Sequence, residues 1–382
     1  MTDTLIQEDS QMRLVEFITV LLLVFSCEGK KKEKKSLNVL TYNVWFTESD
    51  IEAITTKKAR KKKIISALKK SDADLVCLQE VFTAQDVEDI VDGVQKNFPY
   101  SFSGVHKAVN KLPPQKLGKR RPPCDYTRLS NYIACATSNG CTVTTDINSI
   151  TACVLSNCLP EVQNIFLNDN QACRNCITTS SFNIAQCAAE KPVVGGRQMN
   201  EGCLVLLSKK KLRDASFNEY YPKTRVSFTR GYIEAEVEDI ATVRCTHLST
   251  STFQFFEPEL SQEGFTSYDE MNAYEARTLI KSLRGIQPAI IMGGFNSGLA
   301  FTPKLVQQVP ESYQQLLKRF TTRPALQFTH RNPPDRKTKS VIDHVFVKNL
   351  IIRKTKRVFV PKEGEAPMSD HVGVQSVVKA AQ

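Results

Sequence analysis

The sequence predicts an α/β fold built from layers of helix and sheet. Short apolar runs typical of buried strands occur at residues 37–45 and 74–79. Each is followed by a segment with apolar residues near helical spacing, at residues 51–70 and 84–98. The composition, 41% hydrophobic and 24% charged in 382 residues, is ordinary for a globular chain. Alternating strands and helices predict a layered α/β architecture.

The same pattern returns in the second half of the chain. Apolar runs predict strands at residues 203–208, 231–237, 241–246, 289–292, 341–347 and 372–378, and a helix at residues 266–285. One stretch stands out, Ala289–Gly298, because its apolar run stops at two glycines and then presents Asn296 on a turn. Such strand-to-loop junctions are where α/β proteins place active-site groups.

The formal net charge is +11, which favours polyanionic partners such as nucleic acid, phospholipid headgroups or phosphorylated small molecules. A soluble surface with spare lysines is an equally simple explanation. The helix at residues 51–70 is predicted to have a solvated basic outer face, formed by Lys57, Lys58, Arg60, Lys61, Lys62 and Lys63. Residues 107–123 form a second basic segment, a linker that contains prolines.

The N-terminal region predicts export. An apolar run, Phe17–Phe25, is too short to span a bilayer and long enough for a signal-peptide core. We expect residues 1–29 to be a signal peptide with Met12 as the working start. A membrane anchor or a buried helix is the alternative, and the sequence before Cys27 loosely resembles a bacterial lipid-attachment site.

Cysteine usage agrees with a secreted protein. Eight of the 12 cysteines lie in one segment: Cys124, Cys135, Cys141, Cys153, Cys158, Cys173, Cys176 and Cys187. An even number in a short exported segment predicts a disulfide-rich module, and zinc at the CxxC of this segment is the alternative. We expect residues 124–190 to be an insertion in a domain formed by residues 36–123 and 191–382. Cys77, Cys203 and Cys245 lie in apolar runs and are predicted to be buried thiols.

Polar side chains lie at or beside the ends of the apolar runs: Asn43, Glu80, His247, Asn296, Asp343 and His371. Metal-assisted phosphodiester hydrolysis needs such a set. A carboxylate holds a hard divalent cation, which polarises a phosphoryl oxygen, and imidazoles transfer protons. A buried carboxylate fixes the tautomer of its histidine. Each residue alone is more often structural, and it is the ordered set that indicates a site.

This ordered set resembles the endonuclease/exonuclease/phosphatase superfamily, which includes deoxyribonucleases, neutral sphingomyelinases and inositol-polyphosphate phosphatases. The matching motifs are Thr41-Tyr42-Asn43-Val44-Trp45, Leu78-Gln79-Glu80-Val81-Phe82, Thr246-His247-Leu248, Gly293-Gly294-Phe295-Asn296, Ile342-Asp343-His344-Val345-Phe346 and Ser369-Asp370-His371. The resemblance implies a four-layer α/β sandwich of two facing mixed sheets flanked by helices. It also implies cleavage of phosphate esters that depends on Mg²⁺, with Mn²⁺ or Ca²⁺ as alternatives.

By this resemblance Glu80 is the principal metal ligand, Asn43 assists it and Asp370 is a second metal contact. His371 is the general base or a phosphate contact, and Asp343 orients it.

The second half of the chain supplies the other matches. His247 matches the histidine that serves acid–base chemistry in the deoxyribonuclease and sphingomyelinase branches, and Asn296 matches an asparagine that contacts the phosphate. Arg230 is a candidate partner for a phosphate oxygen, with a structural surface arginine as the equal alternative.

The sequence departs from the family at Gly294, where the family has a catalytic aspartate. Glycine can neither bind metal nor orient a water, and losing such a positioned group typically costs orders of magnitude in rate. Three interpretations stay open. The activity is reduced and compensated by a neighbour or a metal-bound water, the protein is a pseudoenzyme that binds phosphate or polyanions, or the codon is changed in this copy.

The substrate stays open between nucleic acid and a phospholipid headgroup, with an anionic membrane surface as a further partner and no obligate protein partner. Phe253, Phe255 and Phe256 are expected to pack in the core, although exposure together would favour a lipid substrate. His330-Arg331 is expected in an exposed loop. An intracellular phosphatase is a third hypothesis, which requires an uncleaved N-terminal run and reduced cysteines.

Overall fold

A computed structural model describes most of the chain. The described residues are 36–46, 56–112, 119–120, 122–141, 152–154, 156–179, 187–188, 193–194, 198–223, 229–250, 264–331 and 338–381. The predicted signal peptide with Met12 and Cys27, the phenylalanines at 253, 255 and 256, and the linker residues Lys116 and Arg121 lie outside them. Within these ranges, no helix has both the length and the apolar character needed to cross a membrane.

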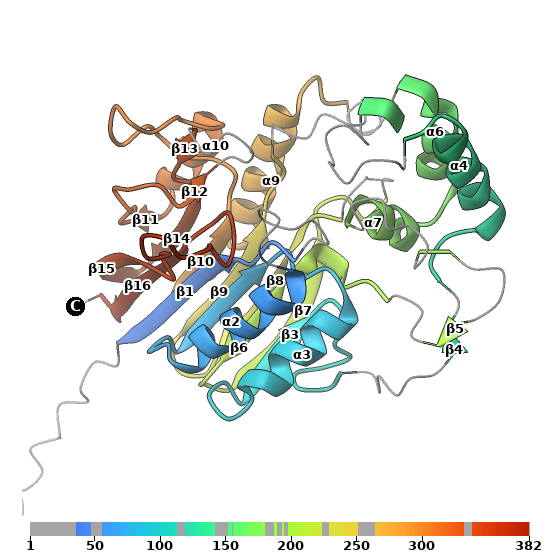
Figure 1. Cartoon of the computed structure of the whole chain (residues 1–382). Coiled ribbons are helices and arrows are strands. Elements are labelled where there is room, and N and C mark those ends of the chain that lie inside the picture. The colour runs from blue at the N-terminus through green and yellow to red at the C-terminus, as the bar shows by residue number, and fades with distance from the viewer. Residues whose placement is uncertain are drawn as a thin grey trace, which may run out of the picture. The chain divides into compact units, whose positions relative to one another are not determined.

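Two six-stranded mixed sheets form the centre of the fold (Figure 1). The first has the order β15-β16-β1-β2-β6-β3, with β15 Leu350–Val358, β16 Gly373–Ala380, β1 Leu37–Asn43, β2 Leu75–Gln79, β6 Val205–Ser208 and β3 Tyr100–Ser103. The second has the order β11-β14-β10-β9-β8-β7, with β11 Thr321–Thr322, β14 Asp343–Lys348, β10 Ala289–Gly294, β9 Ala241–His247, β8 Gly231–Val237 and β7 Leu212–Glu219. In each sheet only the central pair is parallel, β1 with β2 and β9 with β10.

Helices cover the outer faces of both sheets. On the first sheet, α2 (Lys57–Lys69) and α3 (Ala84–Val94) share one apolar cluster with the outward side chains of β1 and β2. On the second, α9 (Tyr268–Ser282) and α10 (Pro310–Leu317) share another with β10 and β14. The expected four-layer α/β sandwich is confirmed.

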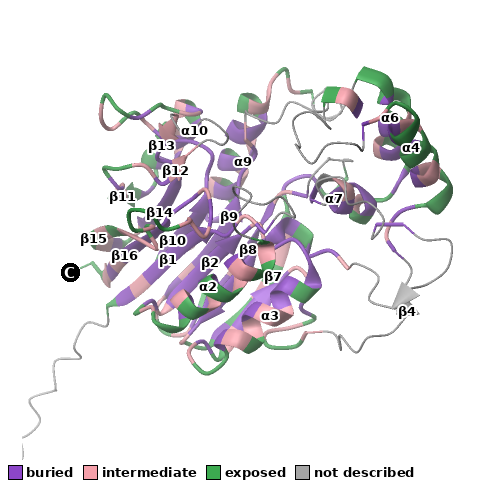
Figure 2. Cartoon of the chain, in the orientation of Figure 1, coloured by how far each residue is buried: buried purple, intermediate pink, exposed green. Residues whose placement is uncertain are grey.

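A third apolar cluster lies between the sheets. It joins the inward side chains of β1, β2 and β6 to those of β8, β9, β10 and β14, including Val39, Leu206, Ile233, Val243 and Met292. The central strands are buried on both faces, as Figure 2 shows in purple. Strands buried on both sides read as continuous apolar runs, which is why the sequence predicts them well. The edge strand β7 is largely exposed and polar, and the sequence pattern missed it.

One predicted basic position is wrong. Arg60 does not lie on the outer face of α2 but is fully buried, and its guanidinium donates a hydrogen bond of 2.7 Å to the carbonyl of Trp45. It also stacks over the Trp45 ring. Two of the lysines, Lys57 and Lys61, form ion pairs with Asp86 of α3 at 2.9 Å. The basic face of α2 is therefore partly used to pack the helix layer and to hold the chain that follows Asn43.

A disulfide between Cys77 and Cys245 corrects the prediction that both are buried thiols. Cys77 on β2 and Cys245 on β9 point into the space between the sheets, and their Cα atoms are 5.4 Å apart. The bond joins the two sheets covalently, three residues before Glu80 and two before His247. Cys203 does remain a buried free thiol, although it lies in a 3-10 turn, Glu201–Cys203, ahead of the strand predicted to contain it.

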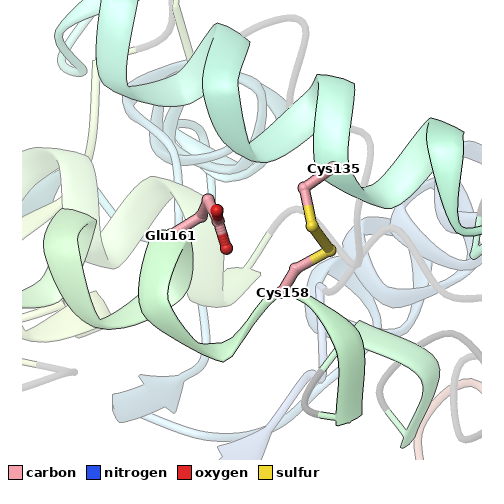
Figure 3. A group of neighbouring side chains, drawn as sticks. All are labelled: Cys135, Cys158 and Glu161. Atoms are coloured by element: carbon pink, nitrogen blue, oxygen red, sulfur yellow. A yellow bond between two sulfur atoms is a disulfide. The ribbon is translucent and has the colours of Figure 1, made fainter.

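The cysteine-rich segment is helical and disulfide-bonded. Its helices are α4 (Tyr126–Ser138), α6 (Leu159–Asn168) and α7 (Gln171–Thr179). All eight cysteines pair, as Cys124–Cys173, Cys135–Cys158, Cys141–Cys153 and Cys176–Cys187. Figure 3 shows the bond that joins α4 to α6, with Glu161 beside it. The predicted disulfides are confirmed, and both cysteines of the CxxC pair elsewhere, which removes the zinc alternative.

Replacing both Cys77 and Cys245 by alanine is expected to lower the free energy of unfolding by about 2–5 kcal/mol, because the disulfide restricts the unfolded chain over a long sequence separation. Chemical denaturation followed by fluorescence measures the difference. Cys203→Ala is the matched control, since it alters a buried cysteine without breaking a disulfide. Equal denaturation midpoints for the double variant and the wild-type protein would contradict this assignment.

Candidate active site

The predicted site residues gather at one end of the two facing sheets. At this edge the parallel central strands end and their antiparallel neighbours β16 and β14 begin. The residues come from both sheets, namely Asn43, Glu80 and His371 from the first and His247, Gly294, Asn296 and Asp343 from the second. Strands of the two sheets contact each other, including β1 with β10 and β14 with β16. Residues separated by more than 300 positions in the sequence therefore become neighbours.

The first sheet contributes a carboxylate and an amide. Glu80 follows β2 directly, in a left-handed backbone conformation with φ of 62°. The Asn43 side-chain amide donates to a Glu80 carboxylate oxygen at 2.8 Å. Burial and the neighbouring charge of Asp370 raise the pKa of Glu80 to about 7. Two carboxylates that interact electrostatically in a buried site are oxygen donors of the kind that suits a hard divalent cation.

A histidine–carboxylate pair bridges the sheets. His371 Nδ1 lies 2.8 Å from Asp343 Oδ2, so Nδ1 carries the proton and donates. Asp343 is fully buried, and the hydroxyl of Thr329 accepts hydrogen bonds from the backbone N–H groups of Ile342 and Asp343. These contacts hold the start of β14, orient the imidazole and leave Nε2 as its working atom. Sequence reasoning found the pair and missed Thr329.

The surrounding carboxylates control the charge of His371. Burial by itself lowers the pKa of this ring, but Asp343 and Asp370 outweigh burial and raise the pKa to about 9. In the metal-free protein the ring is then protonated at neutral pH, with Nε2–H as a donor. The contact of 3.4 Å between the Asn43 amide nitrogen and His371 Nε2 is a hydrogen bond only when the ring is neutral.

His247 and Asn296 form the opposite side of the site. His247 ends β9, and Asn296 lies two residues beyond β10 with a left-handed φ of 48°. The Asn296 amide nitrogen lies 2.7 Å from the carbonyl of Leu248 and 3.3 Å from His247 Nε2. Burial, together with the charges of Arg230 and His371, lowers the pKa of His247 well below its ordinary value. The two histidines therefore differ in charge at neutral pH.

Gly294 lies between these two groups. In the strand register it is opposite His247 of β9 on one side and Asp343 of β14 on the other. A Cβ at this position would be 3.0 Å from His247 Cδ2, a tight contact, and 3.5 Å from Asp343 Oδ1. The backbone conformation of Gly294 is open to any residue, so the turn does not require glycine. The missing family carboxylate would thus stand in the middle of the site.

Helix α9 holds the chain that follows His247. The Glu275 carboxylate accepts hydrogen bonds from the backbone N–H and the hydroxyl of Ser249, at 2.6 and 2.7 Å. The Asn272 amide donates to the carbonyls of Ser249 and Phe295. Both side chains are fully buried, and they join the segment after β9 to the segment after β10. Sequence reasoning missed them, although polar residues three apart among apolar helix positions were a signal.

Arg230 precedes β8, and its charge acts on both Glu80 and His247, lowering the pKa of each. Thr229, the residue before Arg230, is hydrogen-bonded to the cysteine-rich segment. The side chain of Asn175 on α7 accepts from the backbone N–H of Thr229 at 3.1 Å and donates to its hydroxyl at 3.0 Å. Asn175 and Thr229 are both buried. The cysteine-rich segment therefore contacts the chain beside the site, which no sequence pattern indicated.

His330 and Asp370 complete the group. His330 is not in an exposed loop, as the sequence suggested, but begins the short strand β12 (His330–Arg331), which pairs with β13 (Lys339–Ser340). Its ring centroid is 4.5 Å from that of His371, and its Nε2 is 3.8 Å from Asp370 Oδ2. Burial and the charge of His371 lower the pKa of His330 to about 4.

Comparison with known proteins agrees with the fold. The chain is similar to an endonuclease/exonuclease/phosphatase from Beutenbergia cavernae, with 12% identity and a TM-score of 0.51 over 91% of this chain and 72% of that one. It is also similar to one from Bacteroides vulgatus, with 11% identity and a TM-score of 0.50 over 91% and 100%. A sphingomyelinase C from Streptomyces griseocarneus has 12% identity and a TM-score of 0.49 over 91% and 100%. No curated protein matches the sequence.

The sequence profile of the endonuclease/exonuclease/phosphatase family matches residues 40–371. This range includes every residue of the candidate site, from Asn43 to His371. The match covers most of the chain and agrees with the two-sheet sandwich, and this chain belongs to the endonuclease/exonuclease/phosphatase family.

Proposed function

We propose that the protein is a divalent-metal-dependent hydrolase of phosphate diesters. The observation that carries the proposal is the position of the His371–Asp343 pair beside Asn43 and Glu80. It places a ring that can transfer protons next to a carboxylate that can bind a cation. The basic chain suits a polyanionic substrate, either nucleic acid or a phospholipid headgroup on an anionic membrane.

Glu80 is the principal ligand in this proposal, with Asp370 as a second carboxylate and Asn43 in support. Burial and then the charge of Asp370 raise the pKa of Glu80, and this supports the assignment because a bound cation would stabilise the buried charge and relieve the repulsion. Mg²⁺ fits this oxygen-rich set, and Mn²⁺ or Ca²⁺ are alternatives. When bound, the ion would polarise a phosphoryl oxygen and neutralise developing charge.

The remaining residues act on protons and on the phosphate. His371 offers only Nε2, since Asp343 occupies Nδ1. As an imidazolium it contacts the phosphate, and as a neutral ring it accepts a proton from the attacking water. His247 is neutral and serves acid–base chemistry on the other side, beside Asn296, which contacts the phosphate. Arg230 supplies positive charge for a phosphate oxygen.

A second candidate function follows from Gly294. Without the family carboxylate, the protein is a pseudoenzyme that binds phosphate groups or polyanions at the same site. The absence of any side chain at Gly294, between His247 and Asp343, favours this candidate.

The disulfides support a secreted protein, because such bonds persist in oxidising compartments. In this proposal residues 1–29 are the export signal, or Cys27 is lipid-anchored, and residues 124–190 are an insertion in one domain. The pairing of β2 with β6 across this segment supports the insertion.

The substrate class is tested by assaying DNA, RNA, sphingomyelin and bis-p-nitrophenyl phosphate with and without Mg²⁺. We expect Mg²⁺-stimulated hydrolysis of at least one diester, and loss of about 100-fold or more in kcat for His371→Ala, because the proton-transferring ring is removed. His106→Gln is the control, since His106 contacts Ser101 and Ser103 instead of site residues. If none of these substrates is turned over, the hydrolase proposal is rejected and the phosphate-binding pseudoenzyme is the remaining candidate function.

The substitution Gly294→Asp is expected to raise hydrolysis by about 100-fold or more, because it restores a positioned carboxylate between His247 and Asp343. Only a shift of a few tenths of an ångström in the His247 ring is needed to accommodate the Cβ. Steady-state rates with saturating Mg²⁺ measure the gain, with Gly294→Asn as the isosteric control. If the wild-type protein is already as active as Gly294→Asp, a carboxylate at position 294 is not needed for activity.

The pKa of His371 is expected to be about 9 in the metal-free protein, and Asp343→Asn is expected to lower it, since Asp343 is the strongest of the carboxylates that favour the charged ring. NMR titration of the imidazole protons measures both values. Because the folded pKa is raised, the Asp343–His371 pair stabilises the fold fully below the ordinary histidine pKa of about 6.5. That stabilisation is lost as the pH rises through 9. An ordinary pKa for wild-type His371 would refute this electrostatic account.

A further inference from the structure

Three potential metal ligands converge where β12 lies beside the segment that leads into β16. His330 Nε2 is 3.8 Å from Asp370 Oδ2, and His371 Nε2 is 4.0 Å from Asp370 Oδ1. One ligand atom from each of the three residues can be chosen so that all lie within 4.8 Å of one another. Both measured separations are too long for hydrogen bonds. The three side chains are only 12%, 13% and 6% exposed, so they are not loose surface groups.

These separations suit a shared ion. Two ligand atoms at about 2.0–2.1 Å from one tetrahedral Zn²⁺ are roughly 3.4 Å apart. The two His–Asp gaps, 3.8 and 4.0 Å, exceed that value by about 0.4 and 0.6 Å, and the three ligand atoms lie within 4.8 Å of one another, so side-chain rotation must bring them onto one ion.

The outer contacts are those of a metal site. A ligating histidine usually donates its other ring N–H to a carboxylate or another polar acceptor, which aims the free nitrogen at the metal. His371 donates Nδ1–H to Asp343 at 2.8 Å, and His330 Nδ1 lies 3.4 Å from the Ser340 hydroxyl. The Ser369 hydroxyl donates to the carbonyl of Asn43 at 2.8 Å, and its oxygen lies 3.1 Å from Asp370 Oδ1. Each of the two histidines therefore has a polar partner at Nδ1, which leaves Nε2 for the metal.

The backbone holds the two segments together. The N–H of Arg331 donates to the carbonyl of Asp370 at 3.1 Å, and the N–H of Val372 donates to the carbonyl of Thr329 at 2.8 Å. The ligands are thus positioned before any ion binds, which reduces the entropy cost of binding.

We propose that His330, Asp370 and His371 form a binding site for a transition-metal ion such as Zn²⁺, and that the ion inhibits the hydrolase by occupying His371 Nε2. Two imidazoles and one carboxylate favour Zn²⁺ over Mg²⁺, which prefers oxygen ligands. The site is distinct from the cation site at Glu80, since it is centred on His330, although the two share Asp370. Binding stands on the geometry alone, whereas inhibition rests on the proposed function.

A second cluster that resembles a metal site carries no such proposal. Cys135, Cys158 and Glu161 lie together, but the two sulfur atoms are bonded to each other (Figure 3). A disulfide offers no thiolate to a metal.

Zinc binding is tested first without substrate. Metal-free protein in excess Mg²⁺ is titrated with ZnCl₂ in competition with a chromophoric chelator. We expect one zinc ion per chain, weakened at least 10-fold in His330→Gln and unchanged in the control His106→Gln. X-ray absorption of the wild-type zinc adduct is expected to show two imidazole nitrogens, and it needs no variant. Fewer than two imidazoles, or equal affinity of a folded His330→Gln protein, would overturn the site.

Inhibition is tested next, on the substrate found in the assays above. With saturating Mg²⁺, zinc is expected to inhibit the wild-type protein at concentrations that match its measured affinity. For each protein, inhibition is measured relative to its own rate without zinc. The inhibition constant for zinc is expected to rise in His330→Gln by the same factor as the zinc dissociation constant. If zinc binds without inhibiting, the proposed inhibitory role is refuted, whereas the proposed zinc-binding site is not. A protein without activity on any diester but with normal zinc binding would reject the proposed function and the inhibition, and leave the zinc site standing.

Discussion

The packing of the two sheets against each other is the constraint on which the rest of the structure depends. An apolar layer fills the space between them, and the Cys77–Cys245 disulfide crosses that layer just below the site. Because the strand ends are aligned at one edge, polar groups that follow each strand meet across the gap. The Asp343–His371 hydrogen bond is one such contact, and it joins the start of β14 in one sheet to the segment that leads into β16 of the other.

The electrostatic surroundings give the two buried histidines of the site different charges. His371 and His247 are both buried histidines, yet nearby carboxylates raise the pKa of the first while burial and positive neighbours lower that of the second. Such a separation of pKa values is what lets a site hold one charged and one neutral imidazole at the same pH. Gly294 lies opposite His247 in the strand register and contributes no charge, so the electrostatics between the two imidazoles come from their other neighbours.

Sequence reasoning was strongest where local pattern and burial coincide. The central strands read as apolar runs, and the residues after them were found because a polar side chain ends each run. Sequence reasoning failed where the environment of a residue depends on a contact with a residue far away in the sequence. Cys77 and Cys245 looked like separate buried thiols, 168 residues apart, and Arg60 looked like one more exposed cation on a lysine-rich helix. His330 looked like a loop residue, because a two-residue strand leaves no periodic signal.

By itself, the sequence determined the α/β class, the order of the family motifs and the identity of the group missing at Gly294, since these depend on local periodicity and residue type. Only the tertiary structure decided which groups meet. The Asn43 amide lies 3.4 Å from His371 although 328 positions separate them. Asn175 of the cysteine-rich segment binds the residue beside Arg230. Contacts of this kind arise from sheet pairing and layer packing, which bring together residues that no local pattern relates.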